Sequence, residues 1–72
     1  MATSPNPESL QAVIADMRRT VAVAAWRHAL IHIDFEAREL KGRHAGTAVP
    51  LTELREHLIR LAAERHVPTQ IG

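Results

Sequence analysis

Apolar residues in the first half of the chain follow helical spacing on two sides of one axis. The first stripe repeats at intervals of four and three residues and consists of Leu10, Ile14, Met17, Val21, Ala24, His28, Ile31 and Phe35. The second lies about 160° away on a helix that turns by about 100° per residue, and it consists of Val23, Trp26, Leu30, Ile33, Ala37 and Leu40. No glycine or proline interrupts residues 8–41. The pattern predicts one long helix over residues 7–41, with Asn6 as its N-cap and Pro7 in its first turn.

Part of this stretch also allows a strand. From residue 31 to residue 36 the odd positions are apolar and the even ones polar, as in a half-buried strand. A β-branched cluster at residues 20–23 weakens the helix further. A strand pair, however, requires a turn, and the usual turn residues are absent here. We therefore expect a continuous helix, with a break near residue 20 as the alternative.

Residues 42–50 contain two glycines and a proline, which predicts a loop. The following segment predicts a second, shorter helix over residues 51–66, which must end before Pro68. Its apolar face is formed by leucines, namely Leu51, Leu54, Leu58 and Leu61. The expected fold is thus all-α, a hairpin of one long and one shorter helix.

The expected domain organisation is simple. A single helical domain covers residues 7–67, and residues 1–6 and 68–72 are expected to be flexible tails. The chain has 72 residues and no cysteine, so neither disulfides nor cysteine-ligated metal can stabilise it. A chain of this size forms a marginal core by itself.

The two apolar stripes predict association. The second helix can cover only one of them, and a large exposed apolar patch is rare on monomeric proteins. We therefore expect a dimeric four-helix bundle or a complex with a larger protein. The expected interface residues are Val23, Trp26, Leu30, Ile33, Ala37, Leu40, Leu54, Leu58 and Leu61.

Charge gives a weaker indication. The formal net charge is +1 with interspersed signs, which does not specify nucleic acid as a partner. Arg18, Arg19 and Arg27 are nevertheless candidates for phosphate contacts in a dimeric DNA-binding regulator. The alternative is that the basic residues are solvated or paired with acidic ones, for which Asp16, Asp34 and Glu39 are available.

Histidine offers a second alternative function. His28 and His32 are four residues apart, a helical spacing that can place two imidazoles on one divalent metal ion, and Glu36 follows one turn later. Each step of four residues rotates by about 40°, so the three side chains fan out and would reach one ion only with difficulty. A hydrogen-bonded core histidine is the simpler interpretation of His28.

Catalysis is not expected. The chain has no cysteine, no glycine-rich phosphate loop, and serines only near the N-terminus. No stretch approaches the roughly 20 apolar residues of a membrane span, so a cytoplasmic location without membrane contact is expected. The sequence favours a small protein-interaction module that acts as a regulatory or accessory subunit, without a required cofactor.

Overall fold

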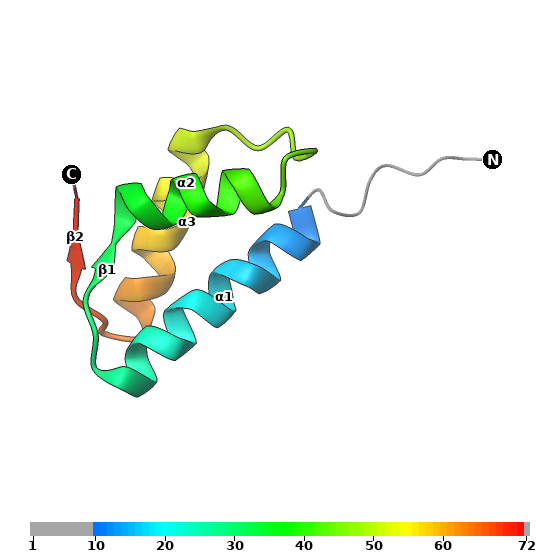
Figure 1. The fold of residues 1–72 in the computed structure, drawn as a ribbon. Helices are drawn as coiled ribbons and strands as arrows, with labels where there is room; N and C mark the ends of the chain where they lie inside the picture. The colour runs from blue at the N-terminus through cyan, green and yellow to red at the C-terminus, as the bar shows by residue number, and fades with distance from the viewer. Residues whose placement is uncertain (1–9, 72) are drawn as a thin grey trace.

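The computed structural model describes residues 10–71, which form three helices and two short strands (Figure 1). In chain order the elements are α1 (Leu10–Arg27), β1 (Ile31–His32), α2 (Ile33–Arg43), α3 (Leu51–Glu64) and β2 (Thr69–Gln70). In this view α1 and α2 are close at one end and diverge toward the other, where β1 joins them, and α3 lies behind both. The predominance of helix confirms the all-α class, but three helices replace the expected two-helix hairpin.

The helix predicted over residues 7–41 is not continuous, and that prediction is wrong. The chain leaves the helix after Arg27, passes through the short strand, and re-enters helix at Ile33. The break does not fall near residue 20 either, where α1 is uninterrupted. The predicted start of the helix at Asn6 lies outside the described residues. The stretch that allowed both a helix and a strand therefore contains a two-residue strand followed by a helix.

Backbone hydrogen bonds explain how α1 ends. The N–H of Ala29 donates to the carbonyl of Ala24 at 2.9 Å, and the N–H of His28 donates to that of Ala25 at 3.2 Å. These two bonds define a Schellman cap, in which the residue after the helix adopts the left-handed conformation. His28 has φ of 54° and fills that position. The chain thus reverses its course without a glycine.

The break allows two stripes from opposite sides of a helix to face one core. The core takes residues from both stripes. Met17, Val21 and Ala24 of α1 and Ile31 of β1 are buried from the first stripe, and Ile33, Ala37 and Leu40 of α2 are buried from the second. Val13 of α1, which belongs to neither stripe, is buried with them. They form one cluster with buried residues of α3, namely Leu54, Leu58 and Ala62. The C-terminal half of the second stripe is therefore covered within the chain and needs no second chain.

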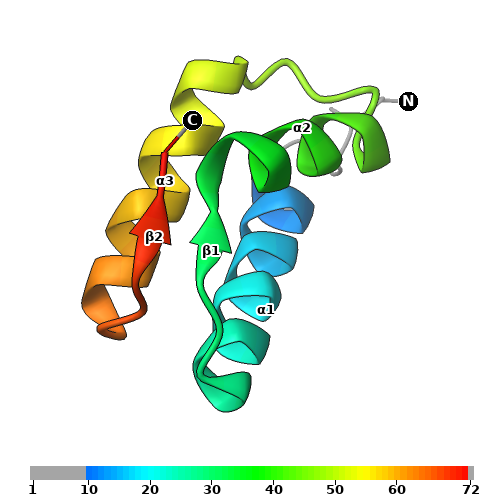
Figure 2. The same cartoon turned by 60° about the vertical axis from the view of Figure 1, so that its left-hand side comes forward.

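The C-terminal residues 68–72 were expected to be a tail, but part of this segment pairs with β1. The two strands are parallel, with Ile31 opposite Thr69 and His32 opposite Gln70. They run side by side in both views (Figures 1 and 2). The N–H of Ile31 also donates to the carbonyl of Pro68 at 3.0 Å. This pairing attaches the end of the chain to the point where α1 and α2 are joined.

α3 is two residues shorter than the predicted helix 51–66, and it ends in the same way as α1. The N–H of Val67 donates to the carbonyl of Ala62 at 2.8 Å, and the N–H of His66 donates to that of Ala63 at 3.1 Å. His66 has φ of 57°. A second Schellman cap therefore leads into β2, as the first leads into β1.

The loop between α2 and α3 is held by polar contacts. The Nζ of Lys41 donates to the carbonyl of Val49 at 2.7 Å and lies 3.5 Å from the carbonyl of Thr47. The Thr47 side chain is buried, and its hydroxyl accepts a hydrogen bond from the N–H of Val49 at 3.2 Å. These contacts satisfy loop carbonyls that helix ends and turns otherwise leave to water.

Candidate functional site

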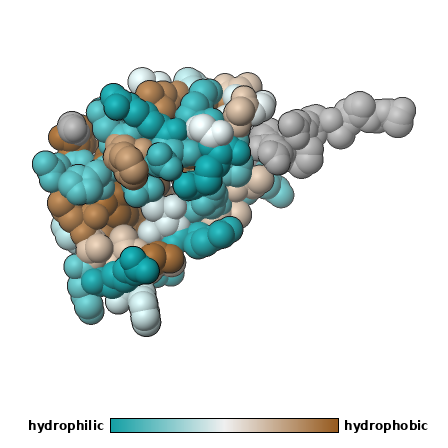
Figure 3. Space-filling view, viewed as in Figure 1, coloured by the Kyte–Doolittle hydropathy of each residue, from teal (hydrophilic) through white to brown (hydrophobic). Residues whose placement is uncertain are grey.

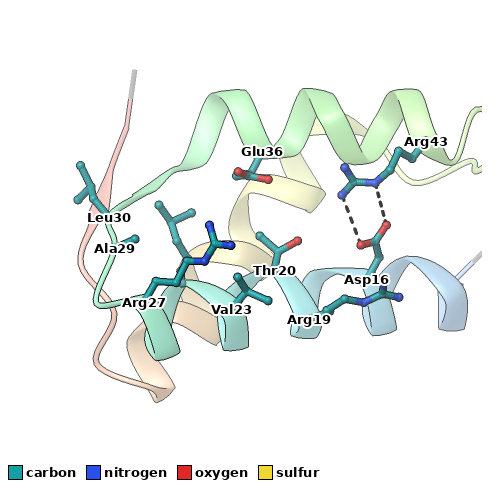
Figure 4. Close-up of a pocket in the computed structure, with 11 residues that line it drawn as sticks. Asp16, Arg19, Thr20, Val23, Arg27, Ala29, Leu30, Glu36 and Arg43 are labelled. Atoms are coloured by element: carbon teal, nitrogen blue, oxygen red, sulfur yellow. Dashed lines mark hydrogen bonds and ion pairs between the residues drawn. The ribbon is translucent and has the colours of Figure 1, made fainter.

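The described part of the chain carries a three-sided hollow. α1 and α2 form two sides, and the segment leading into β1 forms the third (Figure 4). Its volume is about 530 Å³, within the range of about 300–1,000 Å³ that ligand pockets occupy. It is lined by Asp16, Arg19, Thr20, Val23, Ala24, Arg27, Ala29, Leu30, Ile31, Glu36 and Arg43. Arg27 and Glu36 extend into it from opposite sides in Figure 4.

A polar cluster closes the narrow end of this hollow. The carboxylate of Asp16 on α1 accepts hydrogen bonds from Nε of Arg43 at 3.0 Å and from Nη2 of the same guanidinium at 3.3 Å. Nε2 of His44 lies 2.9 Å from the same carboxylate. The end of α2 is therefore tied to the middle of α1.

The pKa of Asp16 reflects this environment. Partial burial desolvates the carboxylate and by itself raises its pKa. The hydrogen bonds from His44 and Arg43, together with their positive charge, outweigh that effect, so the pKa of Asp16 is lowered overall. Asp16 is thus a charged anchor of the fold rather than a candidate proton donor.

The predicted interface residues divide into two groups. Most of them are fully buried in the core, namely Ile33, Ala37, Leu40, Leu54 and Leu58, and Leu61 is half-buried. Because these side chains pack inside the chain, they are not available to a partner. Trp26 is 81% exposed, and Val23 and Leu30 are each 43% exposed. Only these three remain as surface candidates from the predicted set.

Phe35 and Ile71 are also exposed, at 58% and 56%. Phe35 belongs to the first stripe but lies after the break, where its side chain is turned outward. The space-filling view shows hydrophobic surface gathered on the side of the molecule where the strands lie (Figure 3). The apolar surface of this small domain is therefore concentrated around the break between α1 and α2.

The predicted phosphate-contacting arginines do not form one patch. Arg19 and Arg27 line the hollow, whereas Arg18 lies on another side of α1, beside Leu61 and Glu64 of α3. Within residues 10–71, neither Arg19 nor Arg27 has a carboxylate oxygen within 4.0 Å. The hollow therefore carries two guanidinium groups without an ion-pair partner in the described part of the chain.

The expected acidic partners are engaged by other basic residues. Asp16 and Glu39 both approach Arg43, the latter at 3.9 Å. Nε of Arg55 lies 3.1 Å from Asp34, in an orientation that does not form a hydrogen bond. Asp16, Asp34 and Glu39 thus lie within 4.0 Å of Arg43 or Arg55 and not of Arg18, Arg19 or Arg27.

The metal site predicted from His28, His32 and Glu36 is not formed. The three residues lie in the cap of α1, in β1 and in α2, so the helical spacing on which the prediction relied does not exist. No group of three or more His, Cys, Asp or Glu side chains among residues 10–71 is arranged to hold a metal ion. None of the helices described here is long and apolar enough to cross a membrane.

Sequence reasoning missed the role of His44 and its link to Asp16. These residues are 28 positions apart and come together only because the chain folds back at the break. No local spacing could have indicated the contact. Compared with protein-family models, curated proteins and solved structures, the chain shows no match, so its function has to be inferred from its own residues and geometry.

Proposed function

We propose that this chain is a protein-interaction module that acts as a regulatory or accessory subunit through the outward face of α1. The observation that supports this proposal is the 81% exposure of Trp26, beside Val23 and Leu30 at 43% each. Tryptophan is enriched among residues that dominate binding energy, because a large rigid surface is buried on association. Exposed apolar groups next to a hollow are typical of a docking surface.

The partner we propose is a second copy of the chain, as the spacing on α1 suggests. The residues opposite the core repeat at intervals of three and four, and they are Ala12, Ala15, Arg19, Ala22 and Trp26. Small side chains let two helices approach closely, and intervals of three and four are those of paired helices. The outward face of α1 is therefore suited to pack against a second helix.

Antiparallel pairing of two copies of α1 would use this face fully. A twofold axis between residues 20 and 21 would place Trp26 of one copy over Ala15 of the other, because those positions are equidistant from the axis. Ala15 is exposed and leaves room for the indole. Arg19, one turn further on, would bring a guanidinium to the indole face, a favourable cation–π geometry. Trp26 and Arg19 would be covered together.

The test compares self-association of three variants by analytical ultracentrifugation over a wide concentration range. Trp26→Ala removes the anchor and is expected to abolish the dimer, and Ala15→Trp is expected to do the same by filling the space into which the indole packs. Both positions are exposed, so the fold is expected to persist in each variant. Phe35→Ala is the matched control, because it removes an exposed aromatic ring from a different surface. A wild type that stays monomeric would refute the homodimer, and dimers unaffected by the first two substitutions would refute this interface.

DNA binding was the alternative expectation, and the charge on α3 does not favour it. α2, the loop and α3 could present α3 to a groove, but the exposed residues of α3 include Glu53, Glu56 and Glu64 against a single arginine, Arg60. A face with this charge is repelled by phosphates. Absence of a salt-dependent mobility shift with duplex DNA is the expected result.

A further inference from the structure

The helix ends contain two residues in an unfavourable backbone conformation. Among residues 10–71, His28 and His66 are the non-glycine residues with positive φ, at 54° and 57°. Each occupies the same place in a Schellman cap. His28 follows the last residue of α1, and His66 follows α3 after Arg65. Glycine is the usual residue there, because a Cβ atom is strained in this conformation. The chain carries histidine at both positions, where glycine would fit each cap with less strain.

Strained backbone conformations cluster at functional sites, so two strained residues on adjacent segments indicate a candidate site. Here the two turns lie at the same end of the molecule in both views (Figures 1 and 2). The parallel strands pair residues that are 38 positions apart, Ile31 with Thr69 and His32 with Gln70. The same offset relates His28 to His66, three residues before each strand. The two histidines therefore occupy equivalent positions on adjacent segments.

The surface between these turns is hollowed. A pocket of about 400 Å³ is lined by both histidines, and the remaining lining residues are Ala24, Ala25, Ala29, Arg65, Val67 and Pro68. Small and apolar side chains form most of its wall. The lining residues with nitrogen-bearing side chains are His28, His66 and Arg65.

We propose that His28 and His66 together bind one divalent transition-metal ion of the zinc class. Imidazole nitrogen is a preferred ligand of Zn²⁺, Ni²⁺ and Cu²⁺. The C-terminal ends of α1 and α3 converge here, and each contributes the partial negative charge of its last carbonyl groups. Water completes the coordination shell. This pair differs from the ligand set predicted from sequence and shares only His28 with it.

Arg65 allows the charge of the ligand to be tested. Arg65 lines the same pocket, and its positive charge disfavours a bound cation, so Arg65→Gln is expected to strengthen metal binding. If the pocket instead binds an anion, Arg65→Gln weakens the binding of inorganic phosphate, and the substitutions change the affinity for phosphate rather than for Zn²⁺. A weakening of Zn²⁺ binding in Arg65→Gln would contradict the proposed cation site.

The experiment titrates Zn²⁺ into the full chain, without a histidine tag, by isothermal calorimetry. One ion per chain is expected, with affinity reduced at least about tenfold in His28→Gly and in His66→Gly, since perturbing even the outer shell of a metal site costs about 10–100-fold. The double variant is expected to show no binding. Glycine suits both backbone positions, so circular dichroism is expected to show unchanged helix content, which separates loss of binding from loss of fold.

His32→Gln is the control, because this exposed histidine lies in β1 and outside the pocket. It is expected to leave the affinity unchanged. The proposal would be overturned if the wild type binds no Zn²⁺ or if the two glycine variants bind it as tightly as the wild type. It would also be overturned if His32→Gln loses as much affinity as the glycine variants. The site does not depend on the dimer, so its failure and that of the proposed function can be told apart.

Discussion

Replacing His66 by glycine tests the energetic basis of the second helix cap. An L-residue in the left-handed conformation costs about 1–2 kcal/mol, and histidine, which is enriched there among non-glycine residues, is placed at the lower end. Glycine removes that cost but loses about 0.5–1 kcal/mol through the greater freedom of the unfolded chain. His66 is exposed, so little packing is lost. The net expectation is a gain of up to about 0.5 kcal/mol in the free energy of unfolding.

The assay is urea unfolding followed by far-ultraviolet circular dichroism, in a buffer with chelator so that bound metal does not contribute. For a domain of this size the gain corresponds to a rise of at most about 2–4 °C in Tm. His66→Ala is the matched variant, because it removes the same imidazole and keeps the strain. The glycine variant is expected to exceed the alanine variant by about 0.5–1 kcal/mol in the free energy of unfolding, because the relief of strain exceeds the loss from glycine's freedom in the unfolded chain. If the alanine variant is as stable as the glycine variant, backbone strain at His66 does not determine the stability of this cap.

Three further predictions concern the core and its polar ties. Asp16→Asn is expected to lower the free energy of unfolding by about 1 kcal/mol at neutral pH. Because the pKa of Asp16 is lowered in the folded state, the wild type keeps this stabilisation above the pKa of the unfolded chain and loses it as pH falls below about 4. A stability difference between wild type and variant that persists in acid would contradict this expectation. Leu58→Ala is expected to cost about 2–5 kcal/mol by urea unfolding, since the side chain is fully buried, and a cost below 1 kcal/mol argues against this core. Lys41→Ala is expected to cost about 1 kcal/mol, because its Nζ binds the carbonyls of Thr47 and Val49. It is also expected to accelerate amide exchange in residues 44–50, and unchanged exchange there would show that the lysine does not hold the loop.

The candidate surface could be predicted only in part. Trp26, Val23 and Leu30 were identified from their helical spacing and remain exposed. The same stripe also predicted Ile33 and Leu40 as interface residues, yet both are fully buried. Spacing places residues on one face of a helix, but it does not specify whether that face meets its own chain or another. That depends on where the helix ends.

The pocket that contains His28 and His66 was not predictable from local pattern. The two residues are far apart in sequence, and their proximity follows from the pairing of β1 with β2. Two-residue strands carry too little alternation to be recognised, and β2 lies in a segment that composition assigns to a terminal tail. Asp16 and His44 are a similar case, because their contact requires α2 to return along α1.

The sequence by itself determined the helical class, the loop before α3 and the apolar face of that helix. These properties follow from local periodicity and from glycine and proline, which act on the neighbouring backbone. Tertiary structure decided that the first helix breaks at His28. A left-handed histidine costs about 1–2 kcal/mol, whereas burying a side chain such as Ile33 or Leu40 contributes about 1.5–3 kcal/mol. The break is favoured because it turns both apolar stripes toward one core, and that gain exists only when all three helices are in place.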